Sequence, residues 1–384
     1  MKSNYKKLAP YIRLVDIRNS SDERYELLGV SVDKRFIKSI ANTVGTDWRT
    51  YKVIKRGQFC YIPDTSRRGD KIGIALLTDC DIALVSQAYA VFEIANQEEL
   101  LPEYLNLWFK RPEFDRYARF HSHGSVREIF DWEEMCDVEL PIPSVEEQRK
   151  IVSAYETIEN RIAILRQIND NLEAQAQAIF DNLYAQKEDS WLNIQLGDLC
   201  KIKGGKRLPL DHELVEYKTK HPYIRVRDLT DTCILTLNDD FIYITDETHS
   251  HIKSYIVKAN DIIISIVGTI GLISIIDSTL DGANLTENCV RLTNIEKVSP
   301  NYIFFLFKHL KTSREIEERT VGAVQAKLPM YNIETINVPI PNQELLDAFN
   351  SQTAAILSMI RKNISEIITL EKAKECILGH LSSH

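Results

Sequence analysis

Apolar residues recur at alternating spacings of four and three positions along two long stretches of this chain. This spacing is typical of a coiled-coil seam, because it brings successive apolar residues to one face of an α-helix. Each stretch predicts a helix of roughly forty residues, about 60 Å long at 1.5 Å per residue. The seam positions are Ile151, Tyr155, Ile158, Ile162, Leu165, Asn169, Leu172, Ala176, Ile179 and Leu183 in the first stretch and Phe349, Thr353, Ile356, Ile360, Asn363, Ile367, Leu370, Lys374, Ile377 and Leu381 in the second.

The tripeptide Pro-Ile-Pro precedes both stretches, at Pro141 and again 198 residues later at Pro339. The two halves of the chain align at this offset without a gap, which a chance tripeptide would not do. The matching pairs include Tyr104 with Tyr302, Lys110 with Lys308, Gly124 with Gly322 and Val126 with Val324. We therefore interpret the chain as a tandem duplication whose halves have diverged.

The connectivity predicts how the two helices pair. The second globular half begins within a few residues of the end of the first helix, so the second helix must run back along the first to bury its seam. We expect an antiparallel coiled coil with a domain at each end and pseudo-two-fold symmetry. Asn169 and Asn363 occupy seam positions, where a buried amide costs stability but can fix the register.

The segments before the helices predict two mixed α/β (α+β) domains, because short β-branched runs alternate with Gly, Asp and Asn. One helix is expected near residues 102–120 and one near 300–318. The apolar run from Ile262 to Ile276 is interrupted by Gly268 and Gly271 and predicts two buried strands around a turn, since it is too short to span a bilayer. The expected domains are 1–140 and 185–338, with spacer helices at 141–184 and 339–384.

The composition indicates the cellular compartment and shows that charge is unevenly distributed along the chain. No secretory signal precedes the first domain, and seven cysteines without a C-x-x-C pair indicate reduced thiols in a cytoplasmic protein that does not enter the membrane. The net charge is −8, yet residues 34–71 hold ten basic residues against three acidic ones. This window is either a solvated surface or a phosphate-binding face, because only local charge acts on a partner.

A search for catalytic motifs predicts a protein that is not an enzyme and has no cofactor of its own. No two prolines are adjacent, so the (Asp/Asn)-Pro-Pro-aromatic motif of amino-methyltransferases is missing, and the Gly-Gly-Lys-Arg at Gly204 lacks the spacing of a phosphate-binding loop. Pro63-Asp64 and Glu216-Tyr217-Lys218 match a metal-dependent nuclease only superficially. His121 and His123 are interpreted as a loop pair, not as metal ligands.

The order of domain, Pro-Ile-Pro helix, domain, Pro-Ile-Pro helix resembles the specificity (S) subunit of Type I restriction-modification systems. The matching text is ELPIPSVEEQRKIV from Glu139, NVPIPNQELLDAF from Asn337, IQLGDLCKIKGGKRLP from Ile194 and PYIRVRDL from Pro222. The first domain departs from this opening, because Ala9-Pro10 stand where the second domain has Gly197-Asp198 and no Gly-Gly follows.

The resemblance implies two target recognition domains that read a bipartite, asymmetric target in double-stranded DNA, with the helices as spacer. It implies as partners two methyltransferase (M) subunits and the restriction/translocase (R) subunits. Those partners would bring S-adenosylmethionine, ATP and Mg, so that the complex, and not this chain, is the DNA methyltransferase and endonuclease.

DNA contacts need cations for phosphates and polar side chains for base edges. Loop residues of these types are predicted to bind DNA, and Trp48 and Trp108 are predicted to lie in the core. The predicted DNA-binding residues are Lys34, Arg35, Arg67, Arg68 and Arg127 in the first domain and Lys206, Arg207, Arg225, Arg227, Thr269, Gln325 and Lys327 in the second.

Two alternatives remain open from the sequence. The chain could be a scaffold or dimerisation protein whose coiled coil is the functional part, or the separate specificity subunit of a Type II-like restriction-modification enzyme. A scaffold needs no basic face on its globular halves, whereas a DNA reader needs one on both.

Overall fold

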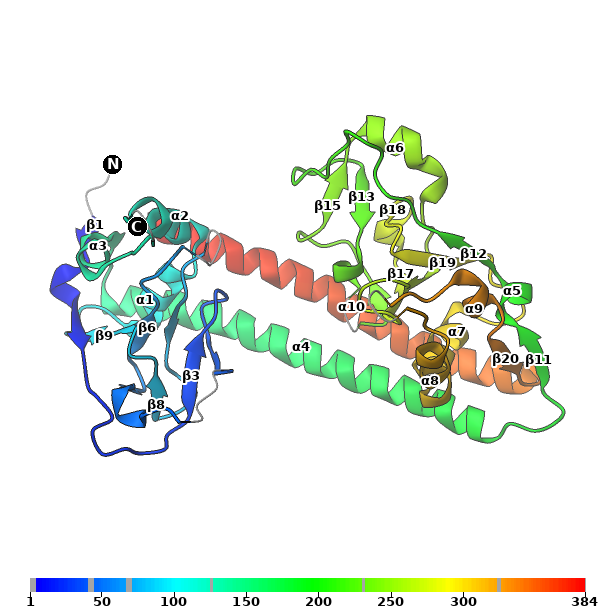
Figure 1. Ribbon diagram of the computed structural model, residues 1–384, viewed down its shortest axis with the longest axis horizontal. Coiled ribbons are helices and arrows are strands. Elements are labelled where there is room, and N and C mark those ends of the chain that lie inside the picture. Colours follow the sequence, from blue (N-terminus) through cyan, green and yellow to red (C-terminus); the bar gives the residue numbers. More distant parts are fainter. Residues whose placement is uncertain are drawn as a thin grey trace. The chain divides into compact units, whose positions relative to one another are not determined.

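The computed structural model describes residues 5–40, 45–66, 71–124, 127–229, 232–322 and 326–383. The chain divides into two compact units: residues 1–162 together with 370–384, and residues 163–369. Each unit contains β-sheets, short helices and one end of each of the two long helices (Figure 1).

The long helices α4 (Val145–Ala185) and α10 (Gln343–His380) pair antiparallel, as predicted. In the first unit the beginning of α4 lies beside the end of α10, where the Lys374 ammonium is 3.2 Å from Glu159 Oε1. In the second unit the later part of α4 lies beside the earlier part of α10, where Asn363 Nδ2 donates to Asn169 Oδ1 at 2.7 Å.

Every residue of the predicted seam is buried or partly buried, and one hydrogen bond joins the two asparagines. This hydrogen bond offsets part of the cost of burying the two amides, and it is available in only one register. Phe180 is fully buried although it lies off the predicted seam, because it packs against Tyr302 and Phe349. The buried seam residues are Tyr155, Ile162, Leu165, Ala176, Leu183, Phe349, Thr353, Ile360 and Leu381.

Each long helix begins with a side-chain cap just after the Pro-Ile-Pro segment. Ser144 Oγ accepts from Glu147 N at 3.3 Å, and Asn342 Oδ1 accepts from Leu345 N at 2.9 Å. These oxygens satisfy first-turn N–H groups that have no partner within the helix.

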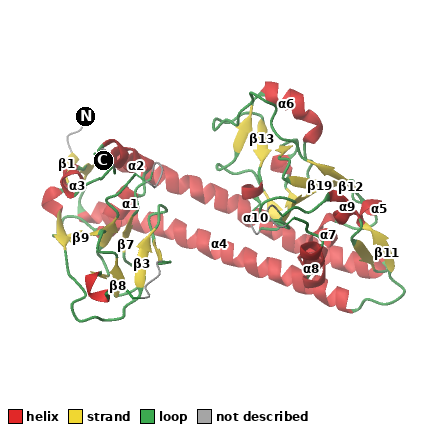
Figure 2. Cartoon of the chain, viewed as in Figure 1, coloured by secondary structure: helices red, strands yellow, loops and turns green. Residues whose placement is uncertain are grey.

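The strands of the first unit, yellow in Figure 2, form two four-stranded sheets, of orders β2-β9-β6-β7 and β4-β3-β8-β5, and a pair β1-β10. Its strands are β1 (Tyr5–Lys7), β2 (Ile12–Val15), β3 (Leu27–Val30), β4 (Phe36–Lys38), β5 (Lys52–Lys55), β6 (Phe59–Tyr61), β7 (Ile74–Leu76), β8 (Ile82–Val85), β9 (Ala90–Ile94) and β10 (Glu139–Pro141). Its short helices are α1 (Pro102–Phe109), α2 (Pro112–Phe120) and α3 (Trp132–Asp137).

The second unit has sheets of orders β12-β19-β16-β17-β14 and β15-β13-β18, and a pair β11-β20. Its strands are β11 (Leu192–Gln195), β12 (Lys201–Gly204), β13 (His221–Ile224), β14 (Ile234–Leu235), β15 (Ile242–Ile244), β16 (Ile262–Ser265), β17 (Ile273–Ile276), β18 (Asn284–Leu285), β19 (Cys289–Thr293) and β20 (Asn337–Ile340). Its short helices are α5 (Leu196–Leu199), α6 (Asp246–Ile252), α7 (Pro300–Lys308), α8 (Leu310–Glu318) and α9 (Met330–Glu334).

The two units share one sheet topology. The antiparallel order β2-β9-β6-β7 corresponds to β12-β19-β16-β17, and β4-β3-β8 corresponds to β15-β13-β18. In both units the second of these sheets contains one parallel pair, β3 with β8 and β13 with β18. The duplication inferred from the sequence is therefore present in the fold.

Each Pro-Ile-Pro segment connects its domain to the long helix that follows it. Strand β10 pairs with β1, and β20 pairs with β11. The Tyr104 hydroxyl donates to the Pro141 carbonyl at 3.0 Å, and the Tyr302 hydroxyl, 198 residues later, donates to the Pro339 carbonyl. Burial raises the pKa of both tyrosines, so each hydroxyl keeps its proton to a higher pH than an exposed tyrosine does.

Each half has two helices where the sequence predicted one. Pro112 begins α2, and the preceding Arg111 is extended (φ −74°, ψ 137°), because the proline ring disfavours a helical residue before it. In the second half His309 is extended (φ −65°, ψ 135°), and its side chain caps α8 by accepting from Lys311 N.

Two other expectations are confirmed. The run from Ile262 to Ile276 forms the buried antiparallel strands β16 and β17. All seven cysteines are free, and four of them are buried. Within the described residues, none of the helices combines the length and the apolar character that a membrane span needs.

We expect Tyr104→Phe and Tyr302→Phe each to lower the free energy of unfolding by about 1–3 kcal/mol, because each substitution leaves a buried proline carbonyl without its donor. Chemical denaturation followed by circular dichroism measures this loss. The control is Tyr217→Phe, since that ring is 64% exposed. Equal stability of Tyr104→Phe and the control would show that the hydroxyl does not hold the Pro-Ile-Pro segment.

Candidate nucleic-acid interface

The main sheet has the order β2-β9-β6-β7 in the first unit and β12-β19-β16-β17-β14 in the second. Most of the loops that carry predicted DNA-binding residues lie at one edge of this sheet, where the same ends of its strands meet. In the first unit β2 and β6 end at this edge, and β9 and β7 begin there, because Val15 lies opposite Val91 and Tyr61 opposite Ala90 and Ile74. In the second unit the same edge is formed by the ends of β12 and β16 and the starts of β19 and β17. A rigid sheet with variable loops at one edge is suited to recognition.

A short hairpin stands beside this edge in both units. His123 and Ile129 exchange two main-chain hydrogen bonds of 3.0 Å, and Val321 and Lys327 exchange bonds of 2.9 and 2.8 Å. Each hairpin is anchored to the segment after β6 or β16, where Phe130 N donates to Pro63 O and Leu328 N donates to Ile266 O, both at 2.9 Å. The hairpins are repeat equivalents, because their positions differ by 198 residues.

Predicted residues lie in these hairpins and the neighbouring turn. Arg127 is exposed in the first hairpin, and Lys327 is exposed in the second. Lys327 also forms a bridge with Val267, so the turn with the exposed Thr269 lies beside it. Gly268 and Gly271 shape that turn with φ angles of 84° and 86°. Three further predicted residues, Arg67, Arg68 and Gln325, lie outside the described residues.

Lys206 and Arg207 follow β12 and are both exposed. A Cβ at Gly205 in their loop would lie 2.0 Å from Thr286 O, so the glycine allows a close backbone approach. Lys206 N donates to Leu285 O at 2.8 Å, and the Lys206 ammonium lies 5.7 Å from the Tyr255 ring centroid. Arg207 Nε donates to Glu287 Oε1 at 2.8 Å, and this contact raises the pKa of the Arg207 guanidinium.

Arg225 and Arg227 lie close together in sequence but differ in environment. The Arg225 side chain is 15% exposed and bonds twice to Asp228, at 2.9 and 2.6 Å, and to the Asp240 carbonyl at 3.2 Å. Arg225 therefore holds its own turn together. Arg227 points to solvent and is the residue of the two that a ligand could reach.

Lys34 is buried, in contrast to the solvent-facing role that the sequence suggested. Its ammonium bonds to the Asp115 carboxylate and, at 2.9 Å, to the Ile72 carbonyl, while Ile72 N donates to Asp115 Oδ1 at 3.0 Å. Burial lowers the pKa of Lys34, and the carboxylate opposes that shift. Lys34 thus ties the β3–β4 turn to α2, and the neighbouring Arg35, 73% exposed, is the cation that this turn presents.

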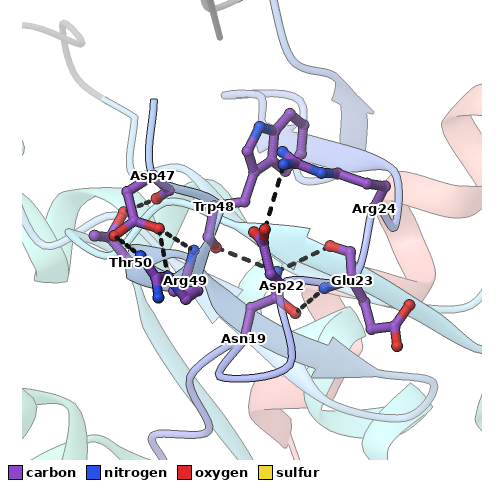
Figure 3. A network of polar contacts seen from close by, with 8 residues as sticks. All are labelled: Asn19, Asp22, Glu23, Arg24, Asp47, Trp48, Arg49 and Thr50. Carbon is purple, nitrogen blue, oxygen red and sulfur yellow. Dashed lines mark hydrogen bonds and ion pairs between the residues drawn. The ribbon is translucent and has the colours of Figure 1, made fainter. Parts of the chain in front are cut away.

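A polar network in the first unit was not predicted from the sequence (Figure 3). It joins the segment after β2 to the segment before β5 through Asn19, which is 1% exposed. Asn19 Nδ2 donates to Glu23 O at 2.9 Å and to Trp48 O at 3.2 Å, and its Oδ1 accepts from Glu23 N at 3.1 Å. The Arg24 guanidinium lies 4.8 Å from the Trp48 ring centroid.

The two tryptophans differ from each other. Trp108 is buried in the core, as expected. Trp48 is only partly buried and supports Arg24, so its assignment to the core was wrong. Nothing in the sequence marks this contact, because the partners are more than twenty residues apart and no motif connects them.

The histidine pair has a carboxylate partner. His121 Nδ1 is 2.8 Å from Glu134 Oε2, and His123 Nε2 is 3.4 Å from Glu134 Oε1. Across the ranges that the structure describes, no cluster of three or more His, Cys, Asp or Glu side chains is arranged to hold a metal ion.

Comparison with known proteins identifies relatives of the whole arrangement. The model of the family described as Type I restriction modification DNA specificity domain matches residues 10–174 and again 188–375. The chain is 24% identical over 319 residues to the Type I restriction enzyme MjaIX specificity subunit of Methanocaldococcus jannaschii, covering 75% of this chain and 70% of that protein. It is 19% identical to the Type I restriction enzyme HindI specificity subunit of Haemophilus influenzae, covering 89% of each.

A solved structure shares the fold. The crystal structure of the Type I restriction-modification system S subunit from M. genitalium superposes with a TM-score of 0.55 at 14% identity, covering 98% of this chain and 95% of that one.

We expect Lys34→Met to lower the free energy of unfolding by about 3–5 kcal/mol, because it strands the Asp115 carboxylate in the interior. Adding Asp115→Asn should recover part of this loss, since the amide oxygen can still accept from Ile72 N. Arg35→Ala, next in sequence but exposed, serves as the control with a change within about 0.5 kcal/mol. Similar unfolding midpoints for Lys34→Met and Arg35→Ala would contradict a structural role for Lys34.

Proposed function

Because this chain belongs to the family of Type I restriction modification DNA specificity domains, we propose that it recognises a bipartite, asymmetric DNA target. Each unit reads one half of the target with the loops at the edge of its main sheet. The observation that carries the proposal is the shared frame with different loop chemistry: equivalent hairpins hold Arg127 and Ile129 in one unit and Lys327 in the other.

We propose that the chain acts without catalytic groups of its own. It positions methyltransferase subunits and restriction/translocase subunits on the DNA, and those partners supply S-adenosylmethionine, ATP and Mg. The coiled coil of α4 and α10 is the spacer between the two readers.

The exposed cations favour a DNA reader over a scaffold. Arg35 and Arg127 in the first unit and Lys206, Arg207 and Lys327 in the second all face solvent from loops. Two of these cations, Arg127 and Lys327, lie in equivalent hairpins of the two units, and a protein whose function is the coiled coil alone would not need them there. Cations that face solvent are available to phosphates, which supply most non-specific DNA affinity.

Replacing residues 191–338 with the corresponding segment of a relative should change one half of the methylated target and leave the other half unchanged, because each unit has its own frame. The measurement is methylation-site sequencing in cells that also express the partner subunits. Simultaneous change of both halves would contradict two independent readers.

Arg127→Ala and Lys327→Ala should each reduce the slope of log K against log salt by roughly 0.9, if each side chain neutralises one phosphate. Binding is measured by titration of a labelled duplex at several salt concentrations. Arg56→Ala is a control, since Arg56 bonds to Asp81 at 2.8 Å beside the far end of β5. A slope that stays the same in both hairpin variants would remove the hairpins from the interface.

A further inference from the structure

The loop after β2 is the topological counterpart of the loop after β12. Both strands are edge strands that pair antiparallel with the equivalent strands β9 and β19. The second loop carries Lys206 and Arg207, which the sequence marks by the preceding Gly-Gly. The first loop contains no Gly-Gly, yet it begins at the same edge of an equivalent sheet. If the second loop contacts DNA, the first is placed to do so as well.

The first loop is held rigid by a different device. In the second unit Gly205 packs directly on the backbone of Leu285 and Thr286. In the first unit the buried Asn19 amide makes three hydrogen bonds that join residues 19–23 to Trp48. Asn19 N also donates to Tyr51 O at 3.0 Å, so main-chain and side-chain atoms of one residue connect both segments.

This frame orients two exposed arginines. The Arg24 guanidinium lies over the Trp48 ring and 3.4 Å from Asp22 Oδ2, and its side chain is 59% exposed. Arg49 bonds through Nε to Asp47 Oδ1 at 3.0 Å and is 64% exposed (Figure 3). A guanidinium held on two sides loses less conformational entropy when it binds, and its planar fork matches the O6 and N7 acceptors of guanine.

We propose that Arg24 reads a base edge in the half-target of the first unit and that Asn19 is its positioning residue. The inference rests on the proposed function. Trp48 stacks on one side of the guanidinium, so Arg24 has a fixed direction, which recognition of a single base pair requires. Arg49, held by Asp47 on the neighbouring segment, contacts the adjacent phosphate.

The test selects preferred sites from duplexes with randomised base pairs, using the chain assembled with its partner subunits. Arg24→Ala should lose roughly tenfold or more of the preference at one base position of one half-target. Arg24→Lys should not restore it, because an ammonium lacks the planar fork. Arg56→Ala, which removes another exposed arginine bonded to an aspartate, should keep the full preference.

Asn19→Ala should reproduce the loss seen with Arg24→Ala although Arg24 and Trp48 are still present. Chemical denaturation of the variant shows whether the unit remains folded under the selection conditions. The matched variant Asn19→Asp retains the oxygen that accepts from Glu23 N but loses both donors, so it should also lose the preference. Full preference in both Asn19 variants would overturn the positioning role.

Two results would overturn the assignment of Arg24. One is an unchanged preference at every position in Arg24→Ala, and the other is complete rescue by Arg24→Lys. The failure of this inference is distinguishable from the failure of the proposed function. If exchange of residues 191–338 changes one half-target while Arg24→Ala changes nothing, only the inference about Arg24 is wrong.

Discussion

A buried main-chain carbonyl must have a hydrogen-bond donor, and this requirement organises both halves of the molecule. The first proline of each Pro-Ile-Pro segment has a carbonyl that faces a tyrosine from the helix that follows the sheet. Proline itself donates no N–H, so the segment forms only a short strand before the long helix begins. This polar contact therefore joins the tyrosine helix to the short strand that leads into the long helix, and it recurs after 198 residues.

The helical parts of the fold were readable from the sequence, because a heptad pattern sustained over about forty residues specifies a long helix with one apolar face. The seam positions of Asn169 and Asn363 were predicted for the same reason, whereas the hydrogen bond between them was found only in the structure. The breaks at Arg111 and His309 were not anticipated. Pro112 gave a signal for the first break that outweighs the surrounding helical pattern, whereas the second depends on a histidine cap that has no sequence signature.

The candidate interface was only partly predictable, because residue type does not reveal burial. Lys34 and Arg35 are neighbours with the same charge, yet one is enclosed with Asp115 and the other faces solvent. Charge counting treated them alike. Conversely, Arg24 became a candidate only when the fold brought Trp48 beneath it and Asn19 between the two segments.

The hairpins at the sheet edge have a consequence for how such a protein can change over generations. Their closing hydrogen bonds join main-chain atoms only, and the closing pair is His123 with Ile129 in one unit and Val321 with Lys327 in the other. The same backbone thus tolerates an imidazole, an aliphatic chain or an ammonium at equivalent positions. Natural variation can therefore sample new side chains at these closing positions with little penalty to folding, so the architecture separates evolvability from stability.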